Sequence, residues 1–233
     1  MMLKAVLFDF DLTLADSTDA AGACIRHALE KMGTEPVDSG RMNATIGLSL
    51  DATFESLTGE TDPDLRSDFR RFFIEHADRI MVARTELLPG ALDALATLRH
   101  EGLRLGIVST KYRYRIEAIL LRHGAADLFQ TVVGGEEVTE HKPDPEGLLL
   151  GLERLDVEGA EAVYVGDHLV DAEAAARAPV PFVGVLTGNT DPSEYRAFPH
   201  LQILEGVSEL PSFLSGRLGG APFSRTKGRA KNR

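Results

Sequence analysis

Residues 5–13 read Ala-Val-Leu-Phe-Asp-Phe-Asp-Leu-Thr, and this stretch decides the fold. Its apolar beginning has the length and composition of a buried strand, and Asp9 and Asp11 follow where that strand would end. A strand that is apolar on both faces is typical of a parallel sheet covered by helices on both sides. The stretch therefore predicts a central strand that carries two acidic side chains at its carboxyl end.

The rest of the chain repeats this pattern. Further apolar runs of strand length occur at residues 103–108, 131–133, 162–165, 182–186 and 201–204. Between them lie segments with helical spacing, at residues 91–99, 116–123, 145–155 and 169–177. Strands that alternate with helices predict right-handed crossovers and an α/β doubly wound, Rossmann-like core with a parallel sheet.

One segment departs from this rhythm. Residues 17–84 contain no convincing strand, but Ser17 to Asp19 can cap a helix that ends near Gly33. A longer helix is predicted over residues 64–82, where apolar side chains recur on one stripe at helical spacing. The sequence therefore predicts an all-helical unit inserted after the first strand.

These features divide the chain into three expected parts. A core domain comprises residues 1–16 and 85–214, an inserted helical cap domain comprises 17–84, and a basic tail, expected to be disordered, comprises 215–233. The formal net charge is −11, although residues 217–233 carry six basic side chains and no acid. The body of the chain is therefore strongly acidic, which disfavours nucleic acid as a partner.

The cysteine content and the hydropathy pattern indicate the cellular compartment in which the protein is expected. Cys24 is the one cysteine, so an internal disulfide is excluded, and we expect a small buried side chain in a reducing compartment. No apolar run is long enough to span a bilayer, and Met1 to Leu14 has the pattern of a strand rather than a signal peptide. We therefore expect a cytoplasmic protein without a membrane partner, either a monomer or a homodimer.

Polar side chains of the kinds that phosphoryl transfer requires follow four of the predicted strands. Asp9 and Asp11 follow the first, Ser109 the second, Lys142 lies beyond the third, and Asp167 follows the fourth. Carboxyl ends of parallel strands meet at one edge of a sheet, where ligands bind near a topological switch point. Clustered carboxylates repel one another and are hard oxygen ligands, so we expect Mg²⁺ there, with Lys142 as the only other counter-charge.

This set of groups fits an enzyme acting on a small phosphorylated metabolite. A carboxylate becomes a workable nucleophile once a metal masks phosphate repulsion, and a second carboxyl two residues later can protonate the leaving oxygen and then deprotonate water. Mg²⁺ and Lys142 would neutralise charge on the phosphoryl oxygens, while Ser109 would hold one of them. We therefore expect hydrolysis of a small phosphate monoester.

With these motifs in order, the chain resembles the haloacid dehalogenase superfamily, and within it the phosphoglycolate-phosphatase-like branch with a helical cap. The resemblance covers residues 3–210. It implies that Asp9 is the nucleophile and Asp11 the general acid and base. It also implies that Ser109 binds the phosphoryl group and that Lys142 stabilises the intermediate.

The same resemblance implies a metal site and its support. Asp9, the main-chain carbonyl of Asp11, and Asp167 would hold Mg²⁺. Asp171 would support that site, and Thr13 would support the loop that follows the nucleophile.

Two positions depart from the family pattern. Leu12 stands where the family usually has glycine, and a leucine there limits the backbone to negative φ or adds strain. We expect an effect on the hinge toward the cap rather than on the chemistry. Ser109-Thr110-Lys111 replaces the more common Thr-Asn-Lys, which preserves the hydroxyl and leaves Thr110 in a supporting role.

Substrate contacts are expected from the cap and from the second strand end. The stretch Thr45-Ile46-Gly47-Leu48 resembles the cap loop that faces substrate in this branch, which implicates Thr45 and Gly47. Arg41 and Arg113 are further candidates, because a guanidinium pairs well with an anionic substrate.

Three other functions share parts of the pattern. A phosphomutase of the β-phosphoglucomutase type has the same core but discharges the aspartyl-phosphate differently. An inorganic pyrophosphatase of the same superfamily is a second alternative, because Lys111 and Arg113 resemble its residues after the second strand. A receiver-like signalling domain also combines carboxylates, Mg²⁺, a hydroxyl and a lysine, but it phosphorylates an Asp on its third strand and lacks a helical insertion.

Overall fold

The structure, a computed structural model, describes residues 2–215. Its centre is a six-stranded sheet in the order β5-β4-β1-β6-β7-β8, in which all paired strands are parallel. The strands are β1 (Ala5–Phe8), β4 (Arg104–Val108), β5 (Thr131–Val133), β6 (Ala162–Gly166), β7 (Phe182–Val185) and β8 (Gln202–Leu204). The chain runs outward from β1 to β5 and then returns to place β6 on the other side of β1. The switch point of the sheet therefore lies between β1 and β6.

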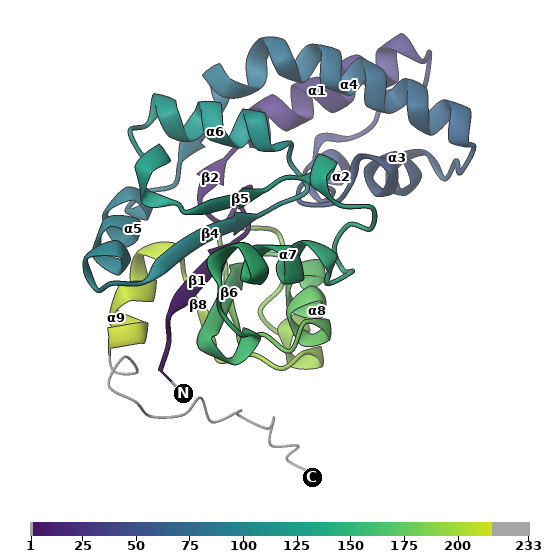
Figure 1. Cartoon of the computed structure of the whole chain (residues 1–233). Helices are drawn as coiled ribbons and strands as arrows, with labels where there is room; N and C mark the ends of the chain where they lie inside the picture. Colours follow the sequence, from purple (N-terminus) through teal and green to yellow (C-terminus); the bar gives the residue numbers. More distant parts are fainter. Residues whose placement is uncertain (1, 216–233) are drawn as a thin grey trace.

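Helices cover both faces of this sheet (Figure 1). Those on one face are α5 (Ala91–His100), α6 (Arg113–Arg122) and α9 (Leu210–Ser215), and those on the other are α7 (Glu146–Leu155) and α8 (Leu169–Arg177). Val6 and Phe8 of β1 pack on the first face, and Ala5 and Leu7 pack on the second. Successive strand residues point to opposite faces, which is why the apolar run of β1 has no polar interruption. The predicted doubly wound α/β fold is confirmed.

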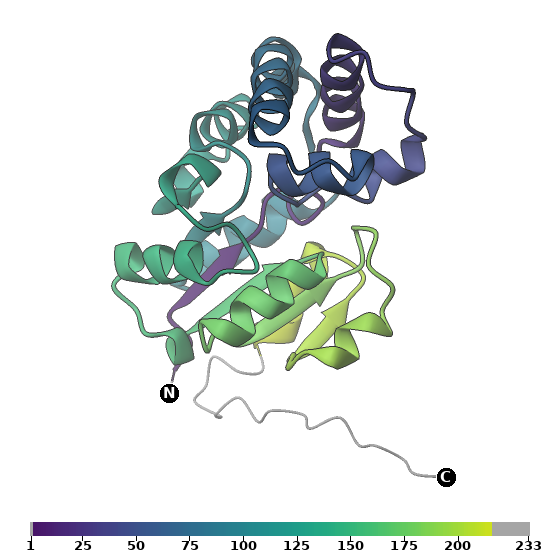
Figure 2. The ribbon, with the colours of Figure 1, turned by 90° about the vertical axis from the view of Figure 1, so that its right-hand side faces the viewer.

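Four further helices form a separate layer beyond the carboxyl end of β1 (Figures 1 and 2). They are α1 (Thr18–Lys31), α2 (Ser39–Asn43), α3 (Leu50–Thr58) and α4 (Pro63–Arg84), and are called the cap helices below. The part of the molecule that contains the six-stranded sheet and its flanking helices is called the sheet half below. Two short strands, β2 (Ala15–Asp16) and β3 (Glu86–Leu87), pair antiparallel where the chain leaves the sheet half and returns to it. The predicted helical insertion is therefore present between β2 and β3.

Capping side chains set the beginnings of three cap helices. Asp38, Ser49 and Asp62 each accept hydrogen bonds from main-chain N–H groups in the first turn of α2, α3 and α4. Gly59 ends α3 in the left-handed conformation, with φ of 77°. The sequence did not predict α2 and α3, because helices of five and nine residues contain too few turns to show a clear period.

The cap helices enclose a hydrophobic core of their own. The rings of Phe54 and Phe69 lie 5.2 Å apart, and those of Phe69 and Phe73 lie 6.2 Å apart. Cys24 is fully buried in the same cluster, and burial raises the pKa of its thiol to about 11. Cys24 therefore packs as a small apolar side chain and stays protonated at neutral pH.

The cap helices are docked on the sheet half through polar contacts as well. Arg115 of α6 pairs with Asp78 of α4, with 2.7 Å between Nη2 and Oδ1. On another side of the junction, the Asn189 side chain donates to the Asn43 carbonyl at 3.0 Å. These contacts hold the two halves together around the space that contains the candidate site.

Short 3₁₀ turns complete the described chain: η1 (Ala126–Leu128), η2 (Gly135–Glu137), η3 (Gly159–Glu161), η4 (Glu194–Ala197) and η5 (Val207–Glu209). Across residues 2–215, no helix has both the length and the apolar character that crossing a membrane requires. The predicted basic tail, apart from Ser215, lies outside the described residues.

Candidate active site

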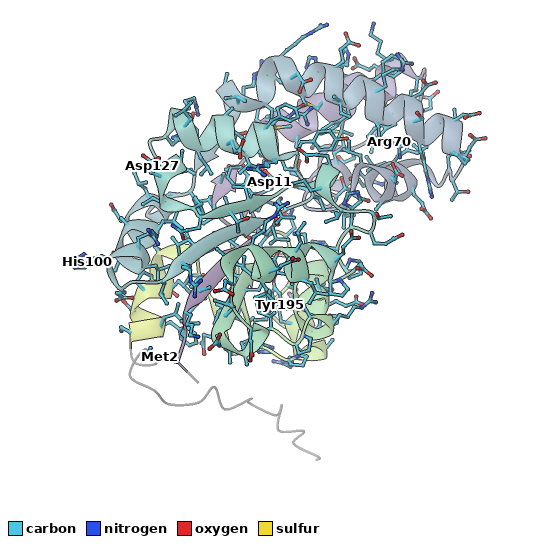
Figure 3. All side chains as sticks on the ribbon, in the orientation of Figure 1. Met2, Asp11, Arg70, His100, Asp127 and Tyr195 are labelled. Carbon is cyan, nitrogen blue, oxygen red and sulfur yellow. The ribbon has the colours of Figure 1, made fainter. Side chains whose placement is uncertain are left out.

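The candidate active site lies where the central strands end, at the switch point of the sheet. Asp9 follows β1 and Asp167 follows β6, and the N–H of Asp9 donates to the Val165 carbonyl at 2.9 Å. Ser109 follows β4, the neighbour of β1 on its other side. Figure 3 shows Asp11 between the sheet and the cap helices. The parallel register therefore brings together side chains that are far apart in the sequence.

Three buried carboxylates meet at this point. One oxygen from each of Asp9, Asp167 and Asp171 lies within 4.8 Å of the others. Burial raises the pKa of Asp9 to about 6, although the nearby Lys142 opposes the shift. Burial also raises the pKa of Asp167 well above its usual range, and the charges of Asp171 and Asp9 add to that effect. The cluster therefore carries more negative charge than its buried surroundings stabilise.

Lys142 is the cation at the centre of the cluster. Its Nζ lies 3.0 Å from Asp9 Oδ1, 2.6 Å from Asp171 Oδ1 and 3.2 Å from the Tyr164 hydroxyl. Burial by itself would lower the pKa of Lys142, but Asp171 and Asp9 outweigh it and raise that pKa above its ordinary value. The ammonium therefore remains charged beside Asp9.

Tyr164 is a member of the site that the sequence did not reveal. Its hydroxyl lies 3.0 Å from Asp171 Oδ1 and 3.1 Å from the Val108 carbonyl, so it fixes the position of the Asp171 carboxylate. In the sequence, Tyr164 is one residue of an uninterrupted apolar strand. No signal in that run distinguishes a tyrosine that serves a site from one that fills a core.

Asp11 has two partners that correct expectations from the sequence. Lys111 Nζ lies 3.0 Å from Asp11 Oδ2, so Lys142 is not the only counter-charge near the acids. Ser17 was expected to cap α1, but its hydroxyl donates to Asp11 Oδ1 and makes no capping hydrogen bond. Both groups orient Asp11 toward the junction with the cap helices.

Asp167 is held by a hydroxyl and by a close approach of the backbone. Thr13 donates to Asp167 Oδ1 at 2.9 Å, so this threonine contacts the acid itself. A Cβ added at Gly188 would lie 1.9 Å from Asp167 Oδ2. The position of Asp167 therefore requires a glycine in the loop after β7, a requirement that sequence spacing did not show.

We expect Gly188→Ala to lower kcat/KM for a small phosphate ester by about tenfold to a hundredfold, because the new methyl group must displace the Asp167 carboxylate. The measurement is phosphate release under saturating Mg²⁺. Gly22→Ala is the matched control, because apart from the backbone of its own helix the only described atom near its Cβ would be in the Arg26 guanidinium, at 3.9 Å. Equal rates for the two variants would show that the Gly188 loop can move without disturbing the site.

Ser109 and Thr110 differ in what they contact. Ser109 is buried at the end of β4, and its Oγ accepts from the Lys111 N–H at 3.4 Å. Thr110 Oγ1 donates to the Gly47 carbonyl at 3.2 Å, which links the second strand end to the cap loop. Thr110 is therefore a contact between the two halves, whereas Ser109 belongs to the strand-end site.

The predicted substrate-binding residues separate into two pairs. Thr45 and Gly47 line a cavity between the cap helices and the sheet half, together with Asp11. Arg41 instead donates to the Ser56 and Leu57 carbonyls. Arg113 pairs with two glutamates, Glu117 and Glu137. Among the described residues that line the cavity, neither arginine is found, because local partners hold both of them elsewhere.

Leu12 adopts the conformation that favours glycine, with φ of 57°. This left-handed backbone costs a leucine about 1–2 kcal/mol. Its side chain is buried against Ala21 of α1 and Ile46 of the cap loop, and such burial contributes about 1.5–3 kcal/mol. The expected strain is therefore present, and it is offset by an apolar contact with the cap.

The acid cluster fits a divalent cation. Asp9 Oδ2 is buried and accepts no hydrogen bond from the described residues. A buried carboxylate oxygen is costly without a donor or a cation, so this atom is available as a metal ligand. Carboxylate oxygens are the hard ligands that Mg²⁺ prefers. Asp171 belongs to this set by position, although it was expected only to support the site.

Comparison with known proteins gives consistent results. Residues 6–185 match the family model described as haloacid dehalogenase-like hydrolase. The chain is 31% identical to a phosphoglycolate phosphatase of Cereibacter sphaeroides, over 91% of this chain and 98% of the relative. It is 32% identical to the pyrophosphatase PpaX of Bacillus velezensis, over 89% of this chain and 94% of the relative.

A solved structure shows the same fold at higher identity. It is described as a haloacid dehalogenase-like hydrolase from Bacteroides fragilis and is 44% identical to this chain, with a TM-score of 0.87. The match covers 89% of this chain and 99% of that one, so it includes both the sheet half and the cap helices.

Proposed function

The chain belongs to the haloacid dehalogenase-like hydrolase family and is a phosphatase, and from this premise we propose that it hydrolyses a small phosphate monoester with Mg²⁺ through an aspartyl-phosphate on Asp9. The observation that best supports the proposal is the buried group of three carboxylates with Lys142 at adjacent strand ends. The phosphoglycolate phosphatase similarity suggests a phosphoglycolate-like substrate.

In the first step, an Asp9 carboxylate oxygen attacks phosphorus, and the bond from phosphorus to the leaving oxygen breaks. Asp11 donates a proton to that oxygen, so the leaving group departs as an alcohol. Lys142 lies beside Asp9 and stabilises negative charge on the phosphoryl oxygens. Ser109 would bind one of these oxygens.

In the second step, water attacks phosphorus and the bond from phosphorus to Asp9 breaks, which releases inorganic phosphate. The deprotonated Asp11 accepts a proton from that water, so the side chain returns to its starting state. Ser17 and Lys111 hold the Asp11 carboxyl in one orientation for both steps.

A bound Mg²⁺ would supply charge neutralisation for the phosphoryl oxygens and for the acid cluster. Asp9, the main-chain carbonyl of Asp11, and Asp167 would hold it. Asp171 lies close enough to contribute, but its contact with Lys142 at 2.6 Å assigns it first to that ammonium.

The proposal is tested by phosphate release from a panel of esters with Mg²⁺ present. We expect turnover of an activated aryl phosphate and of at least one small aliphatic phosphate ester, with kcat/KM for the best ester above about 10⁴ M⁻¹s⁻¹. Asp127→Asn, an exposed position away from Asp11 (Figure 3), is a suitable control variant. Absence of phosphate release from every ester would contradict the proposal.

Pyrophosphate hydrolysis is a second candidate, because a pyrophosphatase is among the relatives and Lys111 lines the cavity beside Asp11. The other residue that suggested it, Arg113, is paired with two glutamates outside the cavity lining. A phosphomutase would transfer the phosphoryl group back to a sugar phosphate, so time-resolved phosphate release separates it from a phosphatase. The receiver-like alternative is withdrawn, since the chain is an enzyme of the hydrolase family.

The remaining expectations are part of this proposal. The absence of an internal disulfide supports a cytoplasmic location, and the acidic composition supports a small metabolite rather than nucleic acid as the partner. Whether the protein is a monomer or a homodimer stays a prediction.

A further inference from the structure

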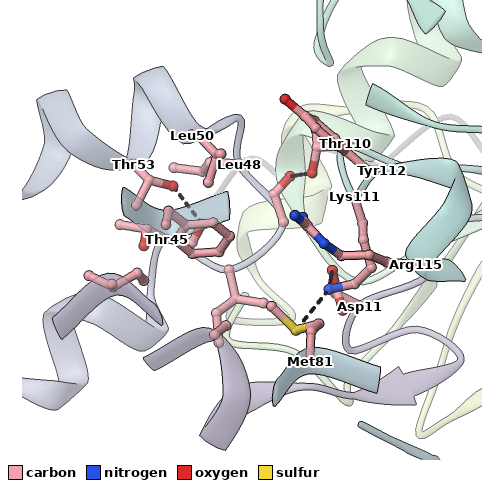
Figure 4. A pocket seen from close by; sticks show the side chains of 15 residues that line it. Asp11, Thr45, Leu48, Leu50, Thr53, Met81, Thr110, Lys111, Tyr112 and Arg115 are labelled. Atoms are coloured by element: carbon pink, nitrogen blue, oxygen red, sulfur yellow. Dashed lines mark hydrogen bonds and ion pairs between the residues drawn. The ribbon is translucent and has the colours of Figure 1, made fainter. Parts of the chain in front are cut away.

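The cavity between the cap helices and the sheet half begins at Asp11 and has a volume of about 60 Å³ (Figure 4). A group that leaves from the phosphoryl centre after taking a proton from Asp11 would occupy this space. The side chains of the cavity therefore bear on which leaving groups the site accepts.

The wall that the cap contributes is largely hydrocarbon. Its larger apolar side chains are Ile25, Ile46, Leu48, Leu50, Phe73 and Met81. Burying a hydrocarbon group against such a wall is favourable, at about 25 cal/mol per Å² of apolar surface. A leaving group as small as glycolate presents one methylene and would leave most of this wall in contact with water.

The threonine hydroxyl groups of the cavity already donate to main-chain carbonyls. Thr45 donates to Met42 at 2.7 Å, Thr53 donates to Thr45 at 3.4 Å, and Thr110 donates to Gly47 at 3.2 Å. A sugar or another polyol would bury several hydroxyls against these committed groups and the hydrocarbon wall. Unmatched buried hydroxyls are costly, so the cavity disfavours polyol leaving groups.

Two cations line the cavity, and they differ in how firmly they are held. Arg115 contacts Asp78 through Nε at 2.9 Å and Nη2 at 2.7 Å. Among the described residues, the Lys111 ammonium has one carboxylate partner, Asp11 at 3.0 Å, and its other contact is the Met81 sulfur at 3.5 Å. Sulfur is a weak acceptor, so Lys111 is the cation that can best bind a new anionic group.

Resting on the phosphatase function above, we propose that the leaving group is an aliphatic hydroxy acid larger than glycolate. Its carboxylate binds Lys111, and its branched alkyl group packs against the cap wall of Leu48, Phe73 and Met81. One added carboxylate matches the one ammonium that lines the cavity within residues 2–215. The multiple charges of pyrophosphate would instead be buried against hydrocarbon, which is unfavourable without further counter-charge.

The test compares phosphate esters of glycolic, lactic and 2-hydroxyisovaleric acid with isobutyl phosphate, glycerol phosphate and pyrophosphate. We expect kcat/KM to rise about fourfold for each added carbon in the hydroxy acid series. The 2-hydroxyisovaleric ester should exceed isobutyl phosphate, which lacks the carboxylate, by about tenfold or more. A flat or falling series, or pyrophosphate as the best substrate, would overturn the proposal.

Two variants separate the contributions of the wall and of the ammonium. Leu48→Thr should flatten the dependence on alkyl size, whereas Leu65→Thr, on the exposed side of α4, should keep it. Lys111→Met should remove the preference for the carboxylate and keep the alkyl preference, with exposed Lys31→Met as its control. If the Leu48 and Lys111 variants keep both preferences unchanged, the leaving group is bound elsewhere.

An activated aryl phosphate distinguishes failure of this proposal from failure of the phosphatase function. If it is hydrolysed while the hydroxy acid series is flat, only the leaving-group proposal is wrong. If neither the aryl phosphate nor any aliphatic ester releases phosphate, the proposed function fails and this inference fails with it.

Discussion

Replacing Asp9 by asparagine is expected to lower kcat for a small phosphate ester by about a thousandfold or more, which is the usual effect of removing a catalytic nucleophile. An amide has nearly the same shape as the carboxylate but cannot form the covalent phosphoryl intermediate. Asp9 is fully buried at the end of β1, so no other carboxylate can take its exact place without moving the strand.

The fold should tolerate this change. Lys142 keeps Asp171 as an anionic partner at 2.6 Å, and loss of one charge relieves repulsion within the acid cluster. Circular dichroism and thermal unfolding of Asp9→Asn, beside Asp127→Asn, check that the two variants are equally folded. A folded Asp9→Asn enzyme with a rate within tenfold of the parent would remove Asp9 from the role of nucleophile.

Removal of Mg²⁺ is expected to have an effect of similar size. With chelator present, phosphate release should fall to near the rate without enzyme, and added Mg²⁺ should restore it. The physical reason is that Lys142 and Lys111 supply two positive charges beside four acids, of which Asp9, Asp167 and Asp171 share one small volume. The phosphoryl dianion would add further negative charge to this buried site.

Metal binding also has a consequence that does not depend on turnover. A cation that binds the folded state should raise the free energy of unfolding, by about 2.7 kcal/mol at a concentration one hundred times Kd. Thermal unfolding of the parent should therefore shift upward with Mg²⁺, and Asp167→Asn should lose most of the shift while Asp127→Asn keeps it. Full activity in chelator, together with no Mg²⁺ shift, would exclude a metal role.

The strands and the acids at their ends could be predicted from the sequence because both are local properties. An apolar run marks a buried strand, and in a parallel sheet the residue after each run lies at the same edge. Asp9, Ser109 and Asp167 could be placed at that edge by their positions in the sequence alone. The long amphipathic helix α4 shows its period over six turns, so its existence was also predictable.

The contacts made by long side chains could not be predicted in the same way. Lys111 was known to follow the second strand, but spacing does not tell whether its ammonium reaches Asp11, Glu137 or solvent. The partners of Arg41 and Arg113 could not be predicted for the same reason, because carbonyls and glutamates close to them in space hold their guanidinium groups. Side-chain direction depends on the tertiary structure rather than on sequence distance.

The left-handed Leu12 has a consequence for how the enzyme responds to temperature. Its contact with Ala21 and Ile46 is apolar, and the strength of apolar contacts declines on cooling. The hydrogen bond between Asn189 and Asn43, on another part of the junction, does not share that dependence. Cooling therefore loosens the junction selectively at Leu12, while warming toward room temperature tightens it. Cap opening in this enzyme should therefore increase more on cooling than in a relative with glycine at this position, whose junction has no such contact to weaken.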